Sequence, residues 1–408
     1  MGWKAWATIG GTLNRKTRPN PTRRDFVRSS LVAGGALLVG FSKIQTLDAK
    51  IQARKDAFEG GKHLGNLDFA GESRSPLDTL LGSELDGRLF SDLSSLTPEN
   101  PIPPTESFYV RTCASHLLEN EKGWKIRLDG LVDKAATLTI KDLKKSARPA
   151  GLHLMECSGN ARATRFGMIS VADWSGAPIS DLLELYKPKS QATRVVVSGF
   201  DSYSARSATS LPGADWVFTL EQLKASKAFL AIEMNGQPLS RDHGAPVRLI
   251  VPGWYGCTAI KWVNAITFVD ENALGTSQMQ EFAARTHQQG VPKLARDYLP
   301  AIINQAAMPT QVEKWLVDEE IKYRVVGILW GGSRPVKKLE IRFNPDKDYV
   351  GVDSFTQTAN DPWSFWSHAW TPKAAGTYLI RLRVTEPPVE TKRLDSGHYV
   401  RSVEVTEV

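Results

Sequence analysis

A single cysteine in a turn-forming segment is the first feature of this sequence that could do unusual chemistry. Residues 155–162 read Met-Glu-Cys-Ser-Gly-Asn-Ala-Arg, so Cys157 is followed by residues typical of a tight turn. A thiolate in a turn can project from the backbone, and Arg162 nearby would favour the ionised sulfur that binds soft metals. A lone cysteine is more often a small buried hydrophobic residue than a ligand. Both interpretations stay open on this segment alone.

Four further segments change that balance because their residue types fit one site. They are 199–201 (Gly-Phe-Asp), 233–248 (Glu-Met-Asn-Gly-Gln-Pro-Leu-Ser-Arg-Asp-His-Gly-Ala-Pro-Val-Arg), 251–256 (Val-Pro-Gly-Trp-Tyr-Gly) and 260–262 (Ile-Lys-Trp). Together with the cysteine turn, they resemble the sulfite oxidase family of molybdenum-cofactor enzymes, whose N-G-x-P-L-x-x-D-H-G-x-P-x-R block is highly specific. The resemblance covers about residues 100–408.

The resemblance implies a cofactor site built around one thiolate. Cys157 would be the single protein ligand to molybdenum and would complete a sulfur-rich coordination begun by the dithiolene of molybdopterin. The pterin and its phosphate would be held at the positions that match the family: Asp201, His243, Arg248, Lys261 and the backbone of Ala259 and Ile260. Arg248 and Lys261 would make charge-assisted contacts, and Asp201 would accept from the heterocycle. The sequence has no C-x-x-C-H motif, so we expect Mo-molybdopterin and no haem in this chain.

An oxyanion substrate needs positive charge beside the metal. Arg111 matches the family arginine of the oxyanion pocket, and Arg162 matches a second one, five residues after the cysteine. Arg393, from the C-terminal region, could fill the place of a third. For Arg393 a solvated surface arginine is an equal alternative. These three arginines are the predicted catalytic residues.

Two departures from the family pattern bear on the reaction. Sulfite-oxidising members carry Asn-His directly after the pocket arginine, where this chain has Thr112-Cys113. They also place a tyrosine after the Lys-Trp pair, whereas the matching position here falls near Phe282. The sequence therefore leaves two alternatives beside sulfite oxidation. One is a reductase of S-oxides or N-oxides on the same cofactor, and the other is a non-catalytic cofactor-binding subunit of a sulfur-oxidising complex.

The three cysteines, Cys113, Cys157 and Cys257, are too few and too widely spaced for a disulfide scaffold or a zinc ribbon. Cys113 and Cys257 fall in segments that resemble parts of one pocket. A disulfide between them is conceivable in an oxidising compartment. Two buried free thiols are the favoured interpretation.

The first 49 residues are typical of an export leader. Arg23-Arg24 followed by Phe26 forms a twin-arginine pattern, and the apolar run 29–41 has the length of a signal-peptide core. We therefore expect a periplasmic protein exported by the twin-arginine pathway, tethered to the membrane if the leader is retained. Residues 1–49 hold eight Lys or Arg against two Asp, a net of +6 out of the formal charge of +7. The rest of the chain is near neutral and offers no electrostatic footprint for nucleic acid.

The elements predicted around these residues change character along the chain. Residues 50–104 are rich in turn residues and predict an irregular approach segment. Residues 105–295 mix strand patterns with helical spacing, at 138–143 and 179–186 for example, and predict an α+β domain. The family resemblance implies that this is the molybdopterin-binding domain, with a sulfite oxidase-like fold. Residues 296–408 alternate apolar and polar residues between turns and predict an all-β, immunoglobulin-like sandwich that resembles the family's dimerisation domain. Trp363, Trp366 and Trp370 are expected in the hydrophobic core rather than on a partner-binding surface.

These observations predict a periplasmic molybdenum-cofactor oxidoreductase that exchanges an oxygen atom with a small sulfur oxyanion such as sulfite. Because no haem site is visible, electrons would leave through an external acceptor, for which a c-type cytochrome is expected. The C-terminal sandwich implies a homodimer or heteromer, and no nucleic-acid partner is expected.

Overall fold

The computed structural model describes residues 57–72, 78–81, 86–112, 123–200, 214–283, 285–286, 299–355 and 362–408. Contacts divide the chain into Met1–Glu59 and Gly60–Val408, and the description that follows concerns the second unit. The predicted leader, Cys113 and Asp201 lie outside the described residues.

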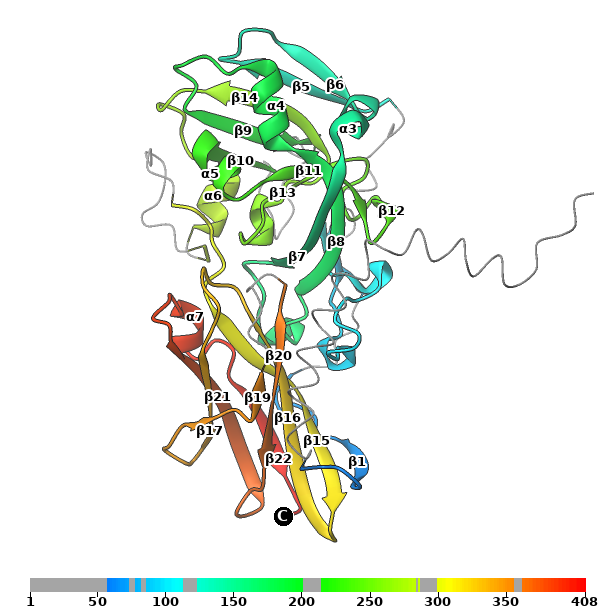
Figure 1. Ribbon diagram of the computed structural model, residues 1–408, viewed down its shortest axis with the longest axis vertical. Helices are drawn as coiled ribbons and strands as arrows, with labels where there is room; N and C mark the ends of the chain where they lie inside the picture. The colour runs from blue at the N-terminus through cyan, green and yellow to red at the C-terminus, as the bar shows by residue number, and fades with distance from the viewer. Residues whose placement is uncertain are drawn as a thin grey trace, which may run out of the picture. The chain divides into compact units, whose positions relative to one another are not determined.

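The central part of the chain is built on two five-stranded sheets (Figure 1). The first has the strand order β10-β9-β14-β5-β6, in which β14 pairs parallel with β5 and antiparallel with β9. Its strands are β5 (Lys125–Gly130), β6 (Ala136–Thr139), β9 (Arg194–Gly199), β10 (Asp215–Thr219) and β14 (Val263–Val269). Alternate residues of β9, Val195 and Val197, are buried, as the period of a strand requires.

The second sheet has the order β12-β11-β8-β7, with β13 also paired to β11. Its strands are β7 (Arg148–Glu156), β8 (Ile169–Pro178), β11 (Phe229–Met234), β12 (Gln237–Pro238) and β13 (Arg248–Ile250). β7 and β8 are antiparallel, and their register joins Glu156 to Ile169. The cysteine segment is the connection between these two residues, so the sheet fixes both of its ends.

Short helices lie between the strands. They are α3 (Ile140–Ser146), α4 (Ile179–Tyr186), α5 (Leu220–Ala225) and α6 (Ser277–Phe282). Thr139 and Asp142 exchange side-chain-to-amide hydrogen bonds in a capping box that begins α3. The helices predicted at 138–143 and 179–186 are thus found as α3 and α4. Among the described residues, no helix is long and apolar enough to cross a membrane.

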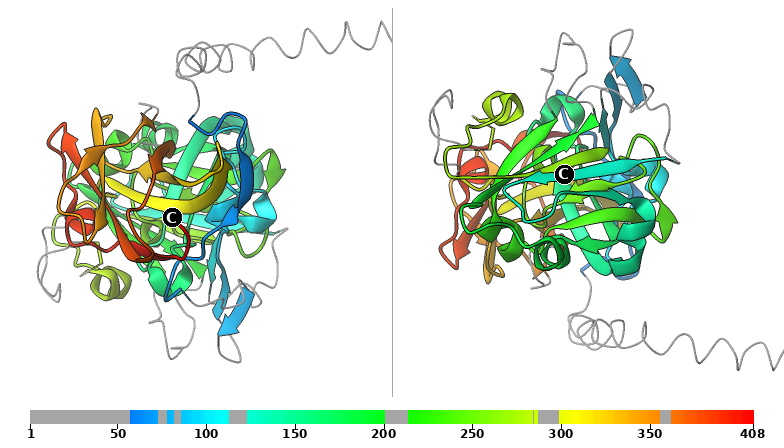
Figure 2. Two further views of the ribbon diagram at one scale, coloured as in Figure 1. Left: turned by 90° about the horizontal axis from the view of Figure 1, so that it is seen from below. Right: turned by 90° about the horizontal axis from the view of Figure 1, so that it is seen from above.

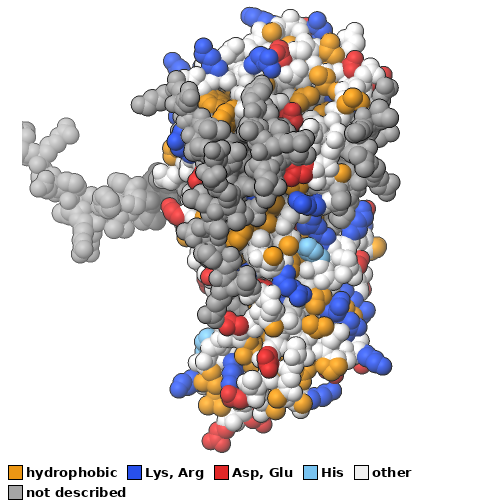
Figure 3. All heavy atoms as spheres, turned by 180° about the vertical axis from the view of Figure 1, so that it is seen from behind, with side chains coloured by type: hydrophobic (Ala, Val, Ile, Leu, Met, Phe, Trp, Pro, Cys, Tyr) orange, Lys and Arg blue, Asp and Glu red, His pale blue; other side chains and the backbone are white. Residues whose placement is uncertain are grey.

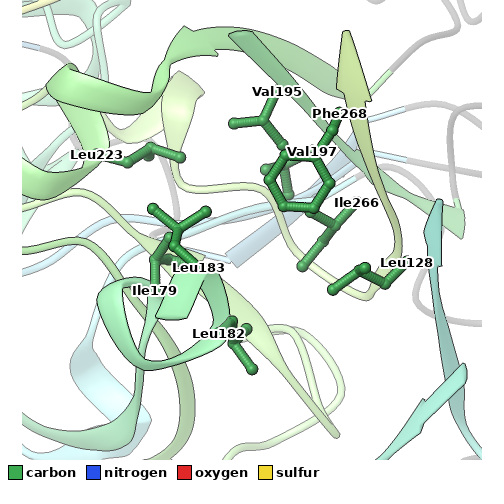
Figure 4. A pocket seen from close by; sticks show the side chains of 9 residues that line it. All are labelled: Leu128, Ile179, Leu182, Leu183, Val195, Val197, Leu223, Ile266 and Phe268. Carbon is green, nitrogen blue, oxygen red and sulfur yellow. The ribbon is translucent and has the colours of Figure 1, made fainter. Parts of the chain in front are cut away.

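Figure 4 shows a small cavity between α4 and the first sheet. Its lining is wholly apolar and includes Leu182 of α4, Val197 of β9 and Ile266 of β14. No polar group faces it, so it is a packing gap of the core and offers nothing that would orient a substrate.

The C-terminal region forms two further sheets, with the orders β1-β15-β16-β20-β19 and β18-β17-β21-β22. Their strands are β1 (Lys62–Asn66), β15 (Ala306–Val317), β16 (Glu320–Trp330), β17 (Lys338–Asn344), β18 (Val350–Gly351), β19 (Ser354–Phe355), β20 (Ser364–Trp370), β21 (Gly376–Glu386) and β22 (Arg401–Val405). Residues of both sheets share one hydrophobic cluster, for example Val325 of β16 and Ile380 of β21. The one-turn helix α7 (Lys392–Asp395) precedes β22. The immunoglobulin-like assignment of this strand-rich region stays a prediction.

Trp363, Trp366 and Trp370 are buried, with 4%, 1% and 8% of their surface exposed. Their prediction as core residues is confirmed: Trp366 and Trp370 belong to the cluster shared by the two C-terminal sheets, whereas Trp363 belongs to the main core cluster. Trp370 stacks on Phe343 of β17 with ring centroids 4.2 Å apart, which joins the two C-terminal sheets.

The structure differs from the irregular segment predicted over residues 50–104. That segment contains β1, β2 (Asp78–Leu81) and β3 (Asp86–Leu89), and the last two form a small sheet with β4 (Val110–Thr112). β1 lies along β15 in Figure 1 and again in the left view of Figure 2. Its side chains are mostly exposed and its partner lies far along the chain, so no local alternation revealed it.

Candidate functional site

The cysteine segment leaves β7 at Glu156 and turns within four residues. The Cys157 amide donates to the carbonyl of Met168 (2.9 Å), and the Cys157 carbonyl accepts from the amide of Asn160 (2.9 Å). The Gly159 amide donates to the Cys157 Sγ at 3.4 Å. The thiol is free and buried. The fold therefore presents one sulfur atom on a backbone turn that is held from both sides.

The surroundings of this sulfur contain groups that raise the pKa of the thiol and groups that lower it. Burial raises the pKa of the Cys157 thiol above its ordinary value. The Gly159 amide and the guanidinium groups of Arg111 and Arg285 oppose that rise because they stabilise the thiolate, whereas the Glu156 carboxylate adds to it. Two arginines from distant parts of the chain therefore lie close enough to act on one thiol.

Sequence reasoning missed Arg285, which lies three residues after the end of α6. Its Nη1 is 3.6 Å from the position that a Cβ atom on Gly159 would take, and its guanidinium lies 5.5 Å from the centre of the Phe282 ring. The only signal available in the sequence was a basic residue one helical turn after Phe282, the position where the family tyrosine was expected. Phe282 itself is partly buried against the main core.

Arg111 and Lys261 are joined through the backbone of β4. The Lys261 Nζ donates to the carbonyls of Arg111 (3.0 Å) and Asp242 (2.9 Å) and lies 4.4 Å from the centre of the Trp262 ring. The carbonyl oxygens and the ring face hold the ammonium group in place. Lys261 thus ties the strand of Arg111 to the His243 turn.

His243 is buried in the turn that follows β12. Its Nδ1 lies 2.8 Å from the Ser240 hydroxyl and its Nε2 lies 3.2 Å from the carbonyl of Phe108. Because a carbonyl only accepts, Nε2 carries the proton and Nδ1 accepts from Ser240. Burial lowers the pKa of His243 to about 4. The ring is therefore neutral near pH 7.

Arg248 is buried and reaches across to the neighbouring loop. It donates to the carbonyls of His243 (2.9 Å) and Ala259 (3.1 Å), and its Nη2 lies 3.4 Å from the sulfur of Met155. Burial lowers the pKa of Arg248 to about 10. The loop 256–260 is thereby held beside the cysteine strand.

Ala259 and Ile260, predicted to present backbone to the cofactor, are buried in this same loop. The loop contains a 3-10 turn, Gly256–Thr258. The carbonyl of Ile260 accepts from the amide of Leu249 (2.8 Å), which joins the loop to β13.

Arg393 comes from α7, more than 230 residues after the cysteine, and contacts the cysteine turn directly. Its Nη2 donates to the carbonyls of Ser158 (2.6 Å) and Arg285 (2.8 Å), and its Nη1 lies 3.8 Å from a carboxylate oxygen of Glu156. The guanidinium carbon lies 4.7 Å from the centre of the Tyr255 ring. Only 11% of the side chain is exposed, so Arg393 is not a solvated surface arginine.

Arg162 takes a different direction. It is exposed, and its Nη2 donates to the carbonyl of Val400 (2.6 Å), next to β22. Its charge helps to lower the pKa of Arg401. Arg111 and Arg285, by contrast, are the arginines whose charges most favour the Cys157 thiolate and so lower the pKa of that thiol. The structure brings Arg111, Arg285 and Arg393 to the cysteine turn. The catalytic role of Arg162 stays a prediction.

Cys257 is a second free, buried thiol, on the loop held by Arg248. Burial raises the pKa of Cys257 to about 12, and the nearby Cys157 adds to the rise. Cys113 lies outside the described residues, so the favoured prediction of two free thiols and its alternative, a disulfide between Cys113 and Cys257, both stay predictions.

The described residues fit a cofactor that brings most of its own metal ligands. In the described part of the chain, no three His, Cys, Asp or Glu side chains gather as they would to hold a metal ion. A single thiolate needs further ligands to hold a soft metal, and molybdopterin supplies two sulfur atoms. The buried Nε of Arg248 has no hydrogen-bond partner, which leaves a cationic donor for an anionic group.

Comparison with known families gives a match over the central part of the chain. The family described as "Oxidoreductase molybdopterin binding domain" matches residues 114–277. This range contains Cys157, His243, Arg248 and Lys261.

Two curated relatives match over longer ranges. The mitochondrial sulfite oxidase of Drosophila melanogaster is 26% identical over 327 residues, which cover 75% of this chain and 56% of that protein. The NADH nitrate reductase of Ulva prolifera is 27% identical over 320 residues, which cover 68% of this chain and 37% of that protein. The chain thus spans about half or less of the length of these relatives.

A similar solved structure is that of the sulfane dehydrogenase SoxCD from Paracoccus pantotrophus. The TM-score is 0.62 at 16% sequence identity, and the match covers 86% of this chain and 94% of that chain. At this identity the likeness shows a common fold, which includes the strand-rich C-terminal region.

Proposed function

We propose that the chain, as a member of the sulfite oxidase family of molybdopterin oxidoreductases, oxidises sulfite or a related small sulfur compound by oxygen-atom transfer. The observation that carries this proposal is the free, buried Cys157 thiol with the charges of Arg111 and Arg285 acting on it. A thiolate beside guanidinium groups suits a soft metal centre that receives an anionic substrate.

Cys157 would ligate molybdenum, while His243, Arg248 and Lys261 would hold the pterin and its phosphate. When bound, the cofactor supplies two-electron oxygen-atom exchange. Arg248 offers its unpartnered Nε–H to an anionic group from a position fixed by two carbonyl contacts. Neutral His243 donates its Nε2–H to the carbonyl of Phe108, so it orients the loop without adding a charge.

The substrate would be held by arginines of three separate segments. Arg111 and Arg285 would bind and orient the oxyanion, since their charges act on the sulfur that marks the centre. Arg393 is fixed by Ser158, Glu156 and the Tyr255 ring, so it adds positive charge without a cost of reorganisation during turnover.

We further propose that the protein works in the periplasm after twin-arginine export and passes its electrons to an external c-type cytochrome. The Arg23-Arg24 leader pattern supports the location. On the face shown in Figure 3, basic and acidic side chains are interspersed, which suits a partner other than nucleic acid. A dimer through the C-terminal sheets is part of the same proposal. Cell fractionation of the Arg23→Lys/Arg24→Lys variant and light scattering of the purified protein test these points.

The first test of the function is sulfite-dependent reduction of ferricyanide by protein with verified molybdenum content. Two ferricyanide ions should be reduced for each sulfite oxidised. Cys157→Ser should lose both molybdenum and turnover, whereas the matched variant Cys257→Ser, which also removes a buried free thiol, should keep its molybdenum. Full metal retention and activity in Cys157→Ser would overturn the ligand assignment.

One observation favours a second candidate, the reduction of S-oxides or N-oxides on the same cofactor. Phe282 is partly buried, and the Arg285 guanidinium lies over its ring. Sulfite-oxidising relatives are expected to have a tyrosine at this position, and Phe282 lacks the hydroxyl that such a tyrosine would donate. Loaded protein that fails with sulfite but reoxidises a reduced dye on addition of dimethyl sulfoxide would support this candidate. Loaded protein that is inactive in both assays would support the non-catalytic subunit.

A further inference from the structure

A short C-terminal segment holds the cysteine turn from outside its own sheet. We call residues 393–400, from α7 to the start of β22, the clasp. Four of its residues each make a hydrogen bond to a different residue of 156–162. These bonds are Arg393 to the Ser158 carbonyl (2.6 Å), His398 to the Asn160 carbonyl (2.9 Å), Tyr399 to the Glu156 carboxylate (2.8 Å) and Arg162 to the Val400 carbonyl (2.6 Å).

Ring contacts reinforce the clasp. Phe166, beyond the cysteine, lies with its ring centre 5.8 Å from that of His398 and 5.6 Å from that of Tyr399. Trp330, at the end of β16, packs edge-on against Tyr399 at 5.0 Å. The aromatic groups therefore leave little freedom to the hydroxyl that meets Glu156.

Glu156 is the centre of these contacts. It is fully buried, and its two oxygens accept from Trp330 Nε1 (2.9 Å), the Tyr399 hydroxyl (2.8 Å) and the Asn160 amide (3.3 Å). All three partners donate, and Arg393 adds a cation at 3.8 Å. A carboxylate surrounded by donors in a buried place is a strong, directional anchor.

We propose that Glu156 is a positioning residue: the C-terminal region, through Trp330 and Tyr399, holds the Glu156 carboxylate and thereby fixes the Cys157 sulfur. The inference rests on the proposed function, since it takes Cys157 as the molybdenum ligand. Glu156 adjoins Cys157 in the chain, so a shift of its side chain moves the peptide that carries the sulfur. The C-terminal region is then part of the metal centre's supporting shell.

The test uses two small changes in the full-length holoprotein. Tyr399→Phe removes one donor and keeps the ring. Glu156→Gln keeps the shape, but its amide NH2 must face either Trp330 or the pair Tyr399 and Asn160, so at least one donor meets a donor. The control is Tyr323→Phe, which removes another buried tyrosine hydroxyl of the C-terminal region, bonded to the Glu407 carbonyl (2.7 Å). Circular dichroism establishes that each variant is folded.

Three readouts apart from turnover decide the matter. In Tyr399→Phe and Glu156→Gln the sulfur-to-molybdenum absorption band should shift, and molybdenum should be bound about 10- to 100-fold more weakly, as for other supporting groups of metal sites. In cofactor-free protein, iodoacetamide should alkylate Cys157 faster than in wild type, where only 8% of the residue is exposed. Tyr323→Phe should match the wild type in all three measurements.

The outcomes separate the inference from the function on which it rests. If Cys157→Ser loses the metal while Glu156→Gln and Tyr399→Phe keep the wild-type spectrum, metal affinity and alkylation rate, the positioning role is wrong and the ligand assignment stands. If Cys157→Ser keeps the metal, the ligand assignment fails and the inference fails with it. A variant that does not fold leaves the decision to the other variant.

Discussion

The cysteine turn and the basic block of residues 240–262 support the same proposed cofactor in opposite ways. In the basic block most partners are near in sequence: His243 and Arg248 are five residues apart, and Arg241 and Trp262 are 21 apart. In the cysteine turn, Glu156 meets a partner 174 residues away, Trp330, and another 243 residues away.

This difference shows that two kinds of support can serve one site. Several contacts of the basic block join residues close in sequence, and these need only a short loop to form. His243, Arg248 and Lys261 also contact residues earlier in the chain, at separations of 93 to 150 residues. The cysteine turn depends on contacts with residues far along the chain, Trp330 and Tyr399, which form only in the complete fold. Disruption of the C-terminal region should therefore loosen the cysteine turn first and leave much of the basic block in place.

The largest effect is expected from Arg393→Met, which removes the cation next to buried Glu156 and the donor to two carbonyls. Loss of one partner of a buried ion pair costs about 3–5 kcal/mol of unfolding free energy. Urea denaturation of the cofactor-free protein measures this loss.

A double variant then separates the charge from the packing. If Glu156 and Arg393 act as a pair, Glu156→Gln/Arg393→Met should be destabilised less than the sum of the single variants. Strict additivity would mean that Arg393 acts only through the carbonyls of Ser158 and Arg285.

The second effect probes the basic block through pH. Burial lowers the pKa of His243 from 6.5 to about 4, so between these values the unfolded chain binds a proton that the folded protein does not. Stability should fall as pH falls through this window, by about 3 kcal/mol over the whole range.

Unfolding free energies at pH 7 and pH 4 in wild type and His243→Gln measure this contribution. The variant should lose much of the pH dependence, because a neutral amide replaces the imidazole. An equal dependence in both proteins would assign it to other groups, such as His398, whose pKa is also lowered by burial.

A third, smaller effect concerns how closely the basic block is packed. Gly244 has a φ of +105°, and a Cβ there would lie 3.1 Å from Arg248 and Lys261 side-chain atoms. Gly244→Ala should cost about 2 kcal/mol of unfolding free energy. Gly236 also has a positive φ, +73°, but nothing lies within 4 Å of a Cβ there. Gly236→Ala should therefore cost less, and equal losses would show that the approach to Arg248 and Lys261 is unimportant.

The smallest effect gives a local baseline outside both regions. Thr139→Ala removes the N-cap of α3, whose partner Asp142 is three residues away, and should cost about 1 kcal/mol. Thermal unfolding measures it against wild type. A loss as large as that of Arg393→Met would contradict the distinction drawn between local and distant support.

The same distinction explains what could be predicted from the sequence. α3 has its cap at Thr139, and α4 has its periodic apolar residues at Ile179, Leu182 and Leu183, so both helices were visible in local patterns. The motif at 235–248 likewise carries its geometry in its own residues. β1 escaped prediction because its residues are exposed and its pairing with β15 is not local.

The support of the cysteine turn was hidden for the same reason. Nothing in the order of residues near Glu156 indicates that Tyr399 and Trp330 donate to it. Arg285 was missed because no motif marks it, and Arg162, five residues from the cysteine, turned out to meet Val400 instead. Proximity in sequence was a poor guide to which arginine lies at the sulfur.

Because Glu156 and Tyr399 lie far apart in sequence, the hydrogen bond between them can form only late in the synthesis of the chain. At a synthesis rate of about 5–20 residues per second, the 243 residues between them take roughly 10 to 50 s to appear. During that time the nascent chain carries the cysteine turn without its C-terminal partners. The turn reaches its final form only after translation has passed the clasp, so metal binding in this geometry must follow the synthesis of residues 393–400.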